Sequence, residues 1–217
     1  MRAFIRRIPR LTRLAGQSLR QLIAPDYCAA CDEPLVDGRV VFCPDCGGCP
    51  SAPQEVAVEA IVGGAYLPPL STAILRMKFG QRADLADRLS DLLPLRSIAR
   101  HTLVVPVPLH LTRLVERGFN PAALLARSLS RRAGGEFAPG VLERCRDTPH
   151  QVRLSARARR ENVDGAFVAR ASAAGRHALL LDDVITTGST LLACSQALYA
   201  AGVVHVTVVA LAATPNS

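Results

Sequence analysis

Two adjacent carboxylates, Asp182 and Asp183, lie between a short apolar run and a stretch of small, mostly hydroxyl-bearing residues. The apolar run, residues 178–181, is typical of a strand that is covered on both faces of a parallel sheet. Open α/β sheets bind ligands at the carboxyl ends of their strands. The candidate ligand-binding residues are therefore the two acids and the small residues after them, Thr186, Thr187, Gly188, Ser189 and Thr190.

The turn after the acids has the composition of an anion site. A helix is predicted over residues 191–201, and free N–H groups at a helix start favour a bound anion. Gly188 lets the backbone approach a ligand closely, and a carboxylate pair can hold sugar hydroxyls or Mg²⁺. No lysine follows the glycine, so the stretch is not a GxxxxGK[ST] loop, nor is it GxGxxG. The alternative is an acidic turn with an ordinary Ser/Thr helix cap.

Four cysteines have metal-binding spacing, Cys28-x2-Cys31-x11-Cys43-x2-Cys46. Two such pairs place four thiolates around one tetrahedral Zn²⁺, and clustered CxxC pairs without an export signal favour metal over disulfides. We therefore predict a zinc ribbon over residues 25–50, a unit too small for a core of its own. Unmetallated core cysteines are the alternative. Cys49 is left out of the ligand set, because the two glycines before it suit a loop.

Basic residues near the ends of predicted elements are candidates for a second anion site. Lys78, the only lysine of the chain, ends a helix predicted over residues 71–79. Arg113 and Arg117 lie in a predicted loop between a buried strand, residues 102–108, and the next helix. The alternatives are a solvent-exposed lysine at a helix end and surface ion pairs of the two arginines.

Two further segments are rich in arginine. Residues 146–164 hold few large apolar side chains, which predicts a mobile loop or lid; a solvated charge run is the alternative. Residues 1–24 place apolar side chains at helical spacing between arginines, which predicts a basic amphipathic helix. That helix could bind an anionic membrane surface, a nucleic acid or a partner groove, or dock on its own protein. Six arginines and no acid lie in the first 20 residues, so the rest of the chain is not strongly basic.

The whole chain, with 217 residues of which 49% are apolar, is long enough for one substantial core and a small appendage. No stretch is long and apolar enough to cross a membrane and no signal peptide is evident, so we expect a cytoplasmic protein. Strands and helices alternate over residues 55–217. This order predicts an α/β domain with a mostly parallel sheet covered on both faces.

The stretch LLLDDVITTGST resembles the phosphoribosyl diphosphate (PRPP) binding loop of type I phosphoribosyltransferases. The resemblance implies the fold of that family and binding of PRPP with Mg²⁺. It implies that Asp182 and Asp183 hold and orient the ribose, and that the 5′-phosphate is held by Thr186, Thr187, Gly188, Ser189 and Thr190. Val184 and Ile185, between the acids and these residues, belong to the same PRPP-binding loop. It also implies that pyrophosphate is held by basic residues of other loops and a flexible hood, namely Lys78, Arg113, Arg117, Arg153, Arg157 and Arg160.

Four blocks in this order resemble the ComF family of bacterial competence-related proteins, namely IAPDYCAAC, MKF, VVPVPLHLTRLVERGFN and TPHQVRLSARARRENVDGAF. The resemblance covers about residues 22–212, and the first 20 residues lie outside it. One departure is Pro121, where the family commonly has Gln. The family is associated with DNA uptake during natural transformation, which implies a helicase partner and single-stranded DNA.

Two functions of different classes remain open at this point. An enzyme would transfer the phosphoribosyl group of PRPP to an amine or nucleobase nitrogen, by positioning and charge stabilisation. A non-catalytic adaptor would keep the phosphate site for a nucleotide or a DNA 5′-phosphate and would use the ribbon to dock a helicase or DNA. The sequence offers no clear general base and no nucleobase-specificity segment.

Overall fold

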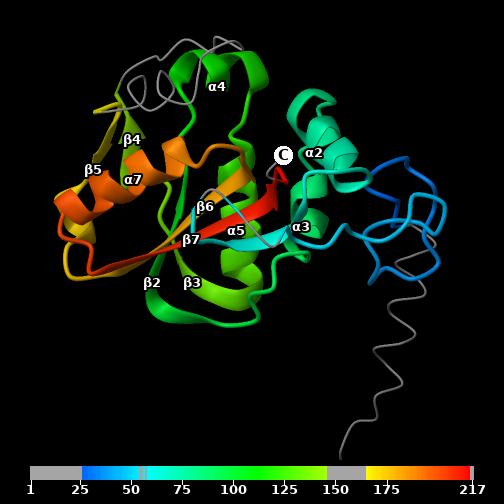
Figure 1. Cartoon of the computed structure of the whole chain (residues 1–217), viewed down its shortest axis with the longest axis horizontal. Coiled ribbons are helices and arrows are strands. Elements are labelled where there is room, and N and C mark those ends of the chain that lie inside the picture. The colour runs from blue at the N-terminus through cyan, green and yellow to red at the C-terminus, as the bar shows by residue number, and fades with distance from the viewer. Residues whose placement is uncertain (1–25, 54–55, 57, 146–164, 216–217) are drawn as a thin grey trace, which may run out of the picture.

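The computed structural model of the chain describes residues 26–53, 56, 58–145 and 165–215 (Figure 1). Two predicted features lie outside these residues: the basic helix at 1–24 and the arginine-rich segment at 146–164, which contains Arg153, Arg157 and Arg160. In the described part, Figure 1 shows a central sheet with helices on both sides, and the cysteine-bearing segment at one end of the molecule.

The centre of the fold is a five-stranded sheet in which all neighbouring strands run parallel. The strand order is β1-β7-β6-β2-β3. The strands are β1 (Ile61–Ala65), β2 (Ile98–Pro106), β3 (Gly134–Phe137), β6 (His177–Ile185) and β7 (His205–Ala213). A separate antiparallel pair is formed by β4 (Leu142–Arg144) and β5 (Phe167–Ala169). The mostly parallel sheet that the sequence predicts is thereby confirmed.

Helices cover both faces of the sheet, with α7 on one face and α5 on the other (Figure 1). The helices are α2 (Leu70–Phe79), α3 (Leu85–Ser90), α4 (Leu111–Arg117), α5 (Pro121–Ala133) and α7 (Ser189–Ala200), with one 3-10 turn, η1 (Ala171–Ala173). None of the helices in the described ranges is long and apolar enough to cross a membrane.

Successive residues of β6 belong to two different hydrophobic cores. Leu181 packs in a cluster with residues of α2, α3 and α5, whereas Leu180 packs in a second cluster with residues of α7. Successive side chains of a strand point to opposite faces of its sheet. Continuing the alternation along β6 places Asp182 on the α7 face and Asp183 on the face of α2 and α5.

The order of the strands reverses between β2 and β6. From β2 the chain crosses through α5 to β3 on one side, and from β6 it crosses through α7 to β7 on the other side. Crossovers between parallel strands are right-handed, so these two helices must lie on opposite faces. A crevice forms beyond the carboxyl ends of the two strands at such a point, and it is the usual ligand site of open α/β sheets.

The loop that follows β2 is tied to the start of α5. Asn120 precedes the helix, its side-chain oxygen accepts a hydrogen bond from the N–H of Ala122 (3.0 Å), and Pro121 occupies the first helical turn. The amide nitrogen of Asn120 donates to the carbonyl of Val107 (2.9 Å). One side chain therefore caps the helix and also holds the strand end that borders the crevice.

The structure defines three local features more closely than the sequence does. Arg113 and Arg117 lie on the short helix α4 rather than in a loop. The first strand runs without a break through Gly63 and Gly64. Helix α7 begins at Ser189, next to Thr190, so the last residues of the predicted phosphate loop lie in its first turn.

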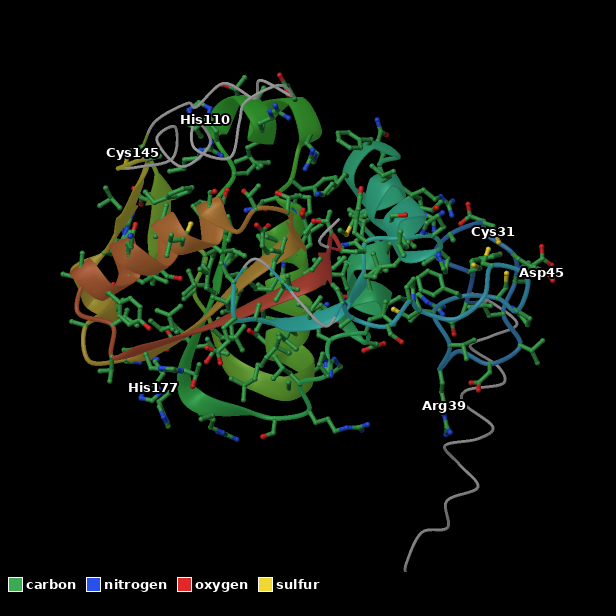
Figure 2. All side chains as sticks on the ribbon, in the orientation of Figure 1. Cys31, Arg39, Asp45, His110, Cys145 and His177 are labelled. Carbon is green, nitrogen blue, oxygen red and sulfur yellow. The ribbon has the colours of Figure 1, made fainter. Side chains whose placement is uncertain are left out.

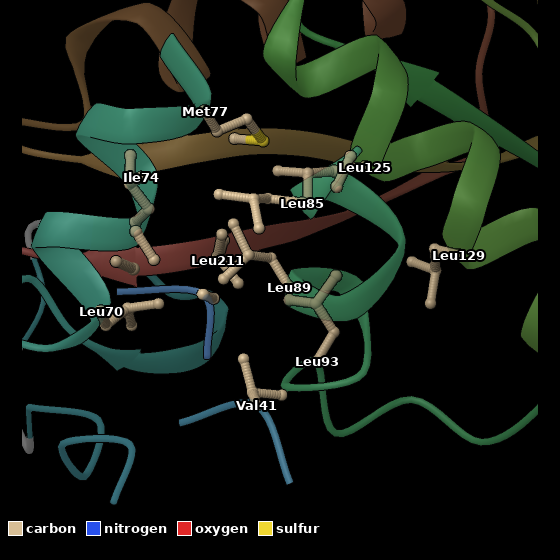
Figure 3. Close-up of a cluster of buried hydrophobic side chains, with 14 of the residues drawn as sticks. Val41, Leu70, Ile74, Met77, Leu85, Leu89, Leu93, Leu125, Leu129 and Leu211 are labelled. Carbon is tan, nitrogen blue, oxygen red and sulfur yellow. The ribbon is translucent and has the colours of Figure 1, made fainter. Parts of the chain in front are cut away.

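The cysteine-bearing segment, residues 26–50, forms turns around a single bridge between Tyr27 and Pro34, with no named strand among its described residues. We call this segment the ribbon. Its buried side chains belong to the same core cluster as those of α2 and α3. Figure 3 shows Val41 of the ribbon beside the cluster that contains Leu70, Leu89 and Leu93. The ribbon therefore shares a core with the α/β domain.

Gly64 is expected to tolerate no side chain, because β1 passes close to the chain that leaves the ribbon. A Cβ at Gly64 would lie 2.5 Å from the carbonyl oxygen of Pro50 and 2.9 Å from Sγ of Cys49. Gly64→Ala should lower the free energy of unfolding by about 1–3 kcal/mol, the usual cost of overpacking. The measurement is denaturant unfolding. Gly48→Ala is the control, since a Cβ at Gly48 would meet nothing within 4 Å, and equal losses in the two variants would contradict this packing.

Candidate functional site

A cavity of about 350 Å³ lies at the carboxyl ends of β2 and β6, where the strand order reverses. It brings together acids from β6, hydroxyl groups from the turn before α7, and cations from α2, α4 and β4. These charged and hydroxyl-bearing lining residues are Lys78, Arg113, Arg117, Arg144, Asp182, Asp183, Thr186 and Thr190, with Tyr66 also in the wall. The four basic residues outnumber the two acids, so the cavity favours an anionic ligand.

The carboxylate of Asp183 forms an ion pair with Lys78. The distance from Nζ of Lys78 to Oδ1 of Asp183 is 2.6 Å, and the two side chains are only 19% and 12% exposed. Burial of a lone carboxylate is costly, and a close ammonium group offsets that cost. Lys78 therefore compensates the charge that β6 carries into the wall of the cavity.

The second carboxyl group, that of Asp182, lies in a different electrostatic environment. Burial and the neighbouring Asp183 carboxylate raise the pKa of Asp182 to about 7. The backbone N–H of Asp183, which donates to Oδ1 of Asp182 (2.8 Å), and the charge of Lys78 act in the opposite direction. Asp182 therefore changes charge near neutral pH, within a cavity that also holds an ionised partner.

Some residues of the turn between β6 and α7 line the cavity, and the others stabilise the turn itself. Val184, Thr186 and Thr190 line the cavity. The other predicted loop residues support the turn: Ile185 is buried in the core, and the hydroxyls of Thr187 and Ser189 lie 3.0 Å apart. Gly188 has a φ of 72°, and a Cβ there would lie 2.5 Å from Cγ1 of Val58. This position therefore requires glycine.

The cations Lys78, Arg113 and Arg117, which sequence analysis selected, all line the cavity. The guanidinium of Arg117 lies 4.8 Å from the ring centroid of Phe79. Burial lowers the pKa of Arg117, and the nearby charge of Arg113 adds to this effect while that of Asp183 opposes it. The arginines of α4 are therefore partly withdrawn from solvent and face the cavity.

Sequence analysis missed Arg144 and His110, which also line the cavity. Arg144 ends β4 and lies 5.6 Å from the ring centroid of Phe167 on the paired strand. His110 precedes α4, and its ring accepts a hydrogen bond from the N–H of Thr112 (3.3 Å); Figure 2 shows it at the α4 end of the molecule. The one signal for Arg144 in the sequence is its place just before the arginine-rich segment.

The ribbon holds a second site, made of sulfur. The Sγ atoms of Cys28, Cys31, Cys43 and Cys46 all lie within 4.8 Å of one another and could bind a metal ion. Burial opposes ionisation of Cys28, but hydrogen bonds from the backbone N–H groups of Cys43, Ala30 and Cys31 lower its pKa to about 6. Side-chain hydrogen bonds with Cys31 and Cys43 raise the pKa of Cys46. Four thiolates at such short distances need a cation to neutralise them.

Cys49 stands apart from the four-sulfur cluster. Its Sγ lies 3.7 Å from the carbonyl oxygen of Pro50 and 3.9 Å from that of Gly63, against the first strand of the sheet. Burial raises the pKa of Cys49. The ligand set expected from the spacing is therefore the set that the structure brings together.

Several curated proteins are similar to this chain over most of its length. The DNA utilization protein YhgH of Escherichia coli (strain K12) is 35% identical over 195 residues, 86% of this chain and 84% of that protein. The protein of the same name from Salmonella typhi is 34% identical over 225 residues, 89% of this chain and 99% of that protein. Competence protein F of Haemophilus influenzae is 35% identical over 205 residues, 89% of this chain and 87% of that protein.

One solved structure, described as the structure of the allosteric regulatory enzyme of purine biosynthesis, aligns with this chain at 20% identity and a TM-score of 0.38. The alignment covers 60% of this chain and 25% of the chain in that structure. No family profile matches the chain.

The raised pKa of Asp182 predicts that the free energy of unfolding decreases as the pH rises towards neutrality. The folded carboxyl group, with a pKa of about 7, holds its proton more tightly than the unfolded one, with its ordinary value of 3.8. The folded state therefore binds more protons between these values, and the free energy of unfolding falls as pH rises through this window. Asp182→Asn removes the titration and keeps the acceptor oxygen. The stability difference between Asp182→Asn and the wild type should shift in favour of the variant by about 2–3 kcal/mol between pH 5 and pH 8.

Asp183→Asn is the matched control for this measurement, because it leaves Lys78 without its carboxylate partner. It should lower the free energy of unfolding at both pH values. Denaturant unfolding of the three proteins at each pH gives the comparison. A constant difference between wild type and Asp182→Asn across the window would show that Asp182 keeps an ordinary pKa.

Proposed function

The chain belongs to the ComF family, and from this premise we propose that it binds a phosphorylated ribose, PRPP above all, together with Mg²⁺. The observation that carries the proposal is the cavity at the strand reversal, where a carboxylate pair faces a hydroxyl-bearing helix start and four cations. The names of the relatives, DNA utilization protein and competence protein, support a role in DNA uptake.

Each part of the cavity matches one part of such a ligand. Thr186, Thr190 and the N-terminus of α7 would receive the 5′-phosphate. Asp182 and Asp183 would accept hydrogen bonds from the ribose hydroxyls, and the surrounding lysine and arginines would hold the diphosphate. Mg²⁺ usually takes one or two carboxylates together with phosphate oxygens, and the two acids of the wall fit this requirement. When bound, Mg²⁺ would neutralise charge on the diphosphate.

In the enzymatic form of the proposal, an amine or nucleobase nitrogen attacks the anomeric carbon of the ribose while its bond to pyrophosphate breaks. The cations of α2, α4 and β4 would stabilise the leaving pyrophosphate. The nucleophile loses a proton in this step, and Asp182, with a pKa of about 7, is suited to accept it. The acceptor is thereby limited to nitrogen nucleophiles that can reach the Asp182 side of the cavity.

The second candidate is a non-catalytic adaptor, favoured by relatives that are named for DNA utilization and competence rather than for an enzymatic activity. In this form the same cavity holds a nucleotide or a DNA 5′-phosphate, and the ribbon docks a helicase or DNA. Release of pyrophosphate from PRPP, assayed with a panel of bases and amines, distinguishes the two: the enzyme releases it with at least one acceptor, the adaptor with none.

For the ribbon we propose that the metal is a structural Zn²⁺. A tetrahedral site with Zn–S bonds of about 2.3 Å places its sulfur atoms about 3.8 Å apart. The distance between Sγ of Cys31 and Sγ of Cys43 is 3.7 Å. All four ligands are sulfur, the donor type of structural zinc sites in small loop-rich units.

PRPP should bind to the wild-type chain only with Mg²⁺ present. Asp183→Asn should weaken binding by about 1–3 kcal/mol, the scale for losing a hydrogen bond to a charged group. The double variant Asp182→Asn/Asp183→Asn should lose binding altogether. Isothermal titration calorimetry measures both, and melting temperatures verify folding. Asp87→Asn is the control, because Asp87 pairs with Arg131 away from the cavity. Unchanged PRPP affinity in the double variant would remove the assignment.

Zinc should be present at one ion per chain in protein purified under reducing conditions. Cys31→Ser should lose the zinc. Because Cys31 is exposed, its replacement does not disrupt the core, so the loss would reflect the missing ligand. Cys49→Ser should keep it, since Cys49 contacts carbonyl groups outside the cluster. Elemental analysis of the three proteins tests this. A wild-type chain without zinc, or zinc loss in Cys49→Ser alone, would contradict the ligand set.

A further inference from the structure

Helix α2 lies between the two sites of the molecule and contacts both. Arg76 of α2 donates from Nη1 to the carbonyl of Ala29 (3.1 Å) and forms an ion pair with Asp32, both in the ribbon. Lys78 of α2 forms its ion pair with Asp183 in the cavity. An α-helix turns about 100° per residue, so residues two apart point in nearly opposite directions. Arg76 therefore faces the ribbon while Lys78 faces the cavity, and Figure 1 shows α2 between the ribbon and the central sheet.

Asp32 is the main polar contact of the ribbon with this helix. It forms ion pairs with Arg76 and with Arg82, which follows the end of α2. The two arginines lie on either side of Lys78 in the sequence. One carboxylate of the ribbon thus holds the segment that carries the cavity lysine at two points.

The position of Asp32 depends on the metal-binding turn. Asp32 directly follows Cys31, has a φ of 65°, and donates from its backbone N–H to the carbonyl of Cys28 (3.0 Å). A non-glycine residue in this left-handed region is held there by its surroundings. Because the same turn carries two of the four sulfur ligands, a bound metal that joins Cys28 to Cys31 also fixes the point from which Asp32 reaches α2.

Apolar packing makes the same connection. Cys28 and Cys43 are buried in the core cluster that contains Leu70, Ile74 and Met77 of α2. The sulfur cluster and the helix thus share one core, and close-packed interiors transmit a displacement instead of absorbing it. A change in the ribbon therefore reaches α2 through side-chain packing as well as through Asp32.

We propose that Asp32 is a positioning residue, which acts through Arg76, Arg82 and α2 to hold Lys78 against Asp183, so that metal loading of the ribbon sets the charge and shape of the ligand cavity. Its consequence for ligand affinity rests on the proposed function of the cavity. The coupling itself concerns only residues of this chain. The coupling is reciprocal by thermodynamic linkage. If metal binding stabilises the Lys78–Asp183 contact, that contact must stabilise metal binding by the same free energy.

The single lysine of the chain makes the coupling measurable without any ligand. Lys78 is the only side-chain amine. After treatment with an amine-acylating reagent, peptide mass spectrometry therefore separates its acylation from that of the α-amino group, which lies on another peptide. The full chain is compared with zinc bound and after removal of zinc by a chelator under reducing conditions. Lys78, paired with Asp183 and 19% exposed, should react slowly with zinc bound and about fivefold or more faster without it, the lower end of typical coupling factors.

Three variants separate positioning from general loss of structure. In the zinc-loaded variants Asp32→Asn and Arg76→Met, the reagent should acylate Lys78 faster than in the wild type. Both variants should keep one zinc per chain. Asp45→Asn is the control: Asp45 also adjoins a metal ligand, but Figure 2 shows it at the outer side of the ribbon. Thiol labelling of Cys194, a residue of α7 whose side chain is fully buried, is followed in parallel. Continued protection of Cys194 shows that the acceleration at Lys78 is a local change.

The results decide the proposal in either direction. Equal acylation of Lys78 in zinc-loaded wild type and Asp32→Asn would overturn it, as would an equal acceleration in Asp45→Asn. If Lys78 responds as expected and PRPP with Mg²⁺ does not bind to the wild type, the coupling stands and the proposed ligand is wrong. If PRPP binds equally well to the wild type with and without zinc, the ligand stands and the coupling to affinity is wrong.

Discussion

The ion pair between Lys78 and Asp183 is the contact on which the cavity depends. Strand β6 delivers two carboxyl groups at consecutive positions into the protein, and two adjacent buried carboxylates repel each other. One of them, Asp183, is compensated by the ammonium of Lys78 at 2.6 Å. The other, Asp182, responds with a pKa raised to about 7. The lysine thus decides which of the two acids carries a charge at neutral pH, and α2 must lie where it does for that lysine to reach β6.

The alternation of β6 explains how both acids can serve one cavity. Within the sheet, neighbouring side chains go to opposite faces, and the two cores on either side of β6 follow this rule. Near the carboxyl end of the strand, beyond its pairing partner β2, both faces open onto the same crevice. Asp183 meets α2 on one side, and Asp182 approaches α7. Burial of the Cys194 thiol on α7, together with the nearby charge of Asp182, raises the pKa of Cys194. The cavity therefore extends across the edge of the sheet, and each acid has its own environment.

Much of the candidate site could be predicted from the sequence, because its signals are local. The acid pair, the hydroxyl-bearing turn, the cysteine spacing and the Asn120 cap each lie within a few residues of one another. Helix α4 could not be predicted in this way, since none of its residues is buried and an apolar stripe facing a core is what identifies a surface helix. The ion pair of Lys78 with Asp183 and the position of Arg144 in the cavity wall could not be predicted either. Both depend on contacts between segments that lie far apart in the chain.

The ribbon also departs from what its sequence suggests, because the four clustered cysteines are not its only means of stabilisation. Val41 and Phe42 are buried in the core of α2 and α3, and burial of each such side chain contributes about 1.5–3 kcal/mol. The arginine contacts at the rim are partly exposed, and ion pairs of that kind contribute about 0–1 kcal/mol each. The apolar contacts therefore supply most of the free energy of docking, while the ion pairs of Asp32 with Arg76 and Arg82 determine how α2 is oriented on the ribbon. A small change in orientation matters here more than a small change in stability, because the opposite side of that helix carries the lysine that compensates Asp183.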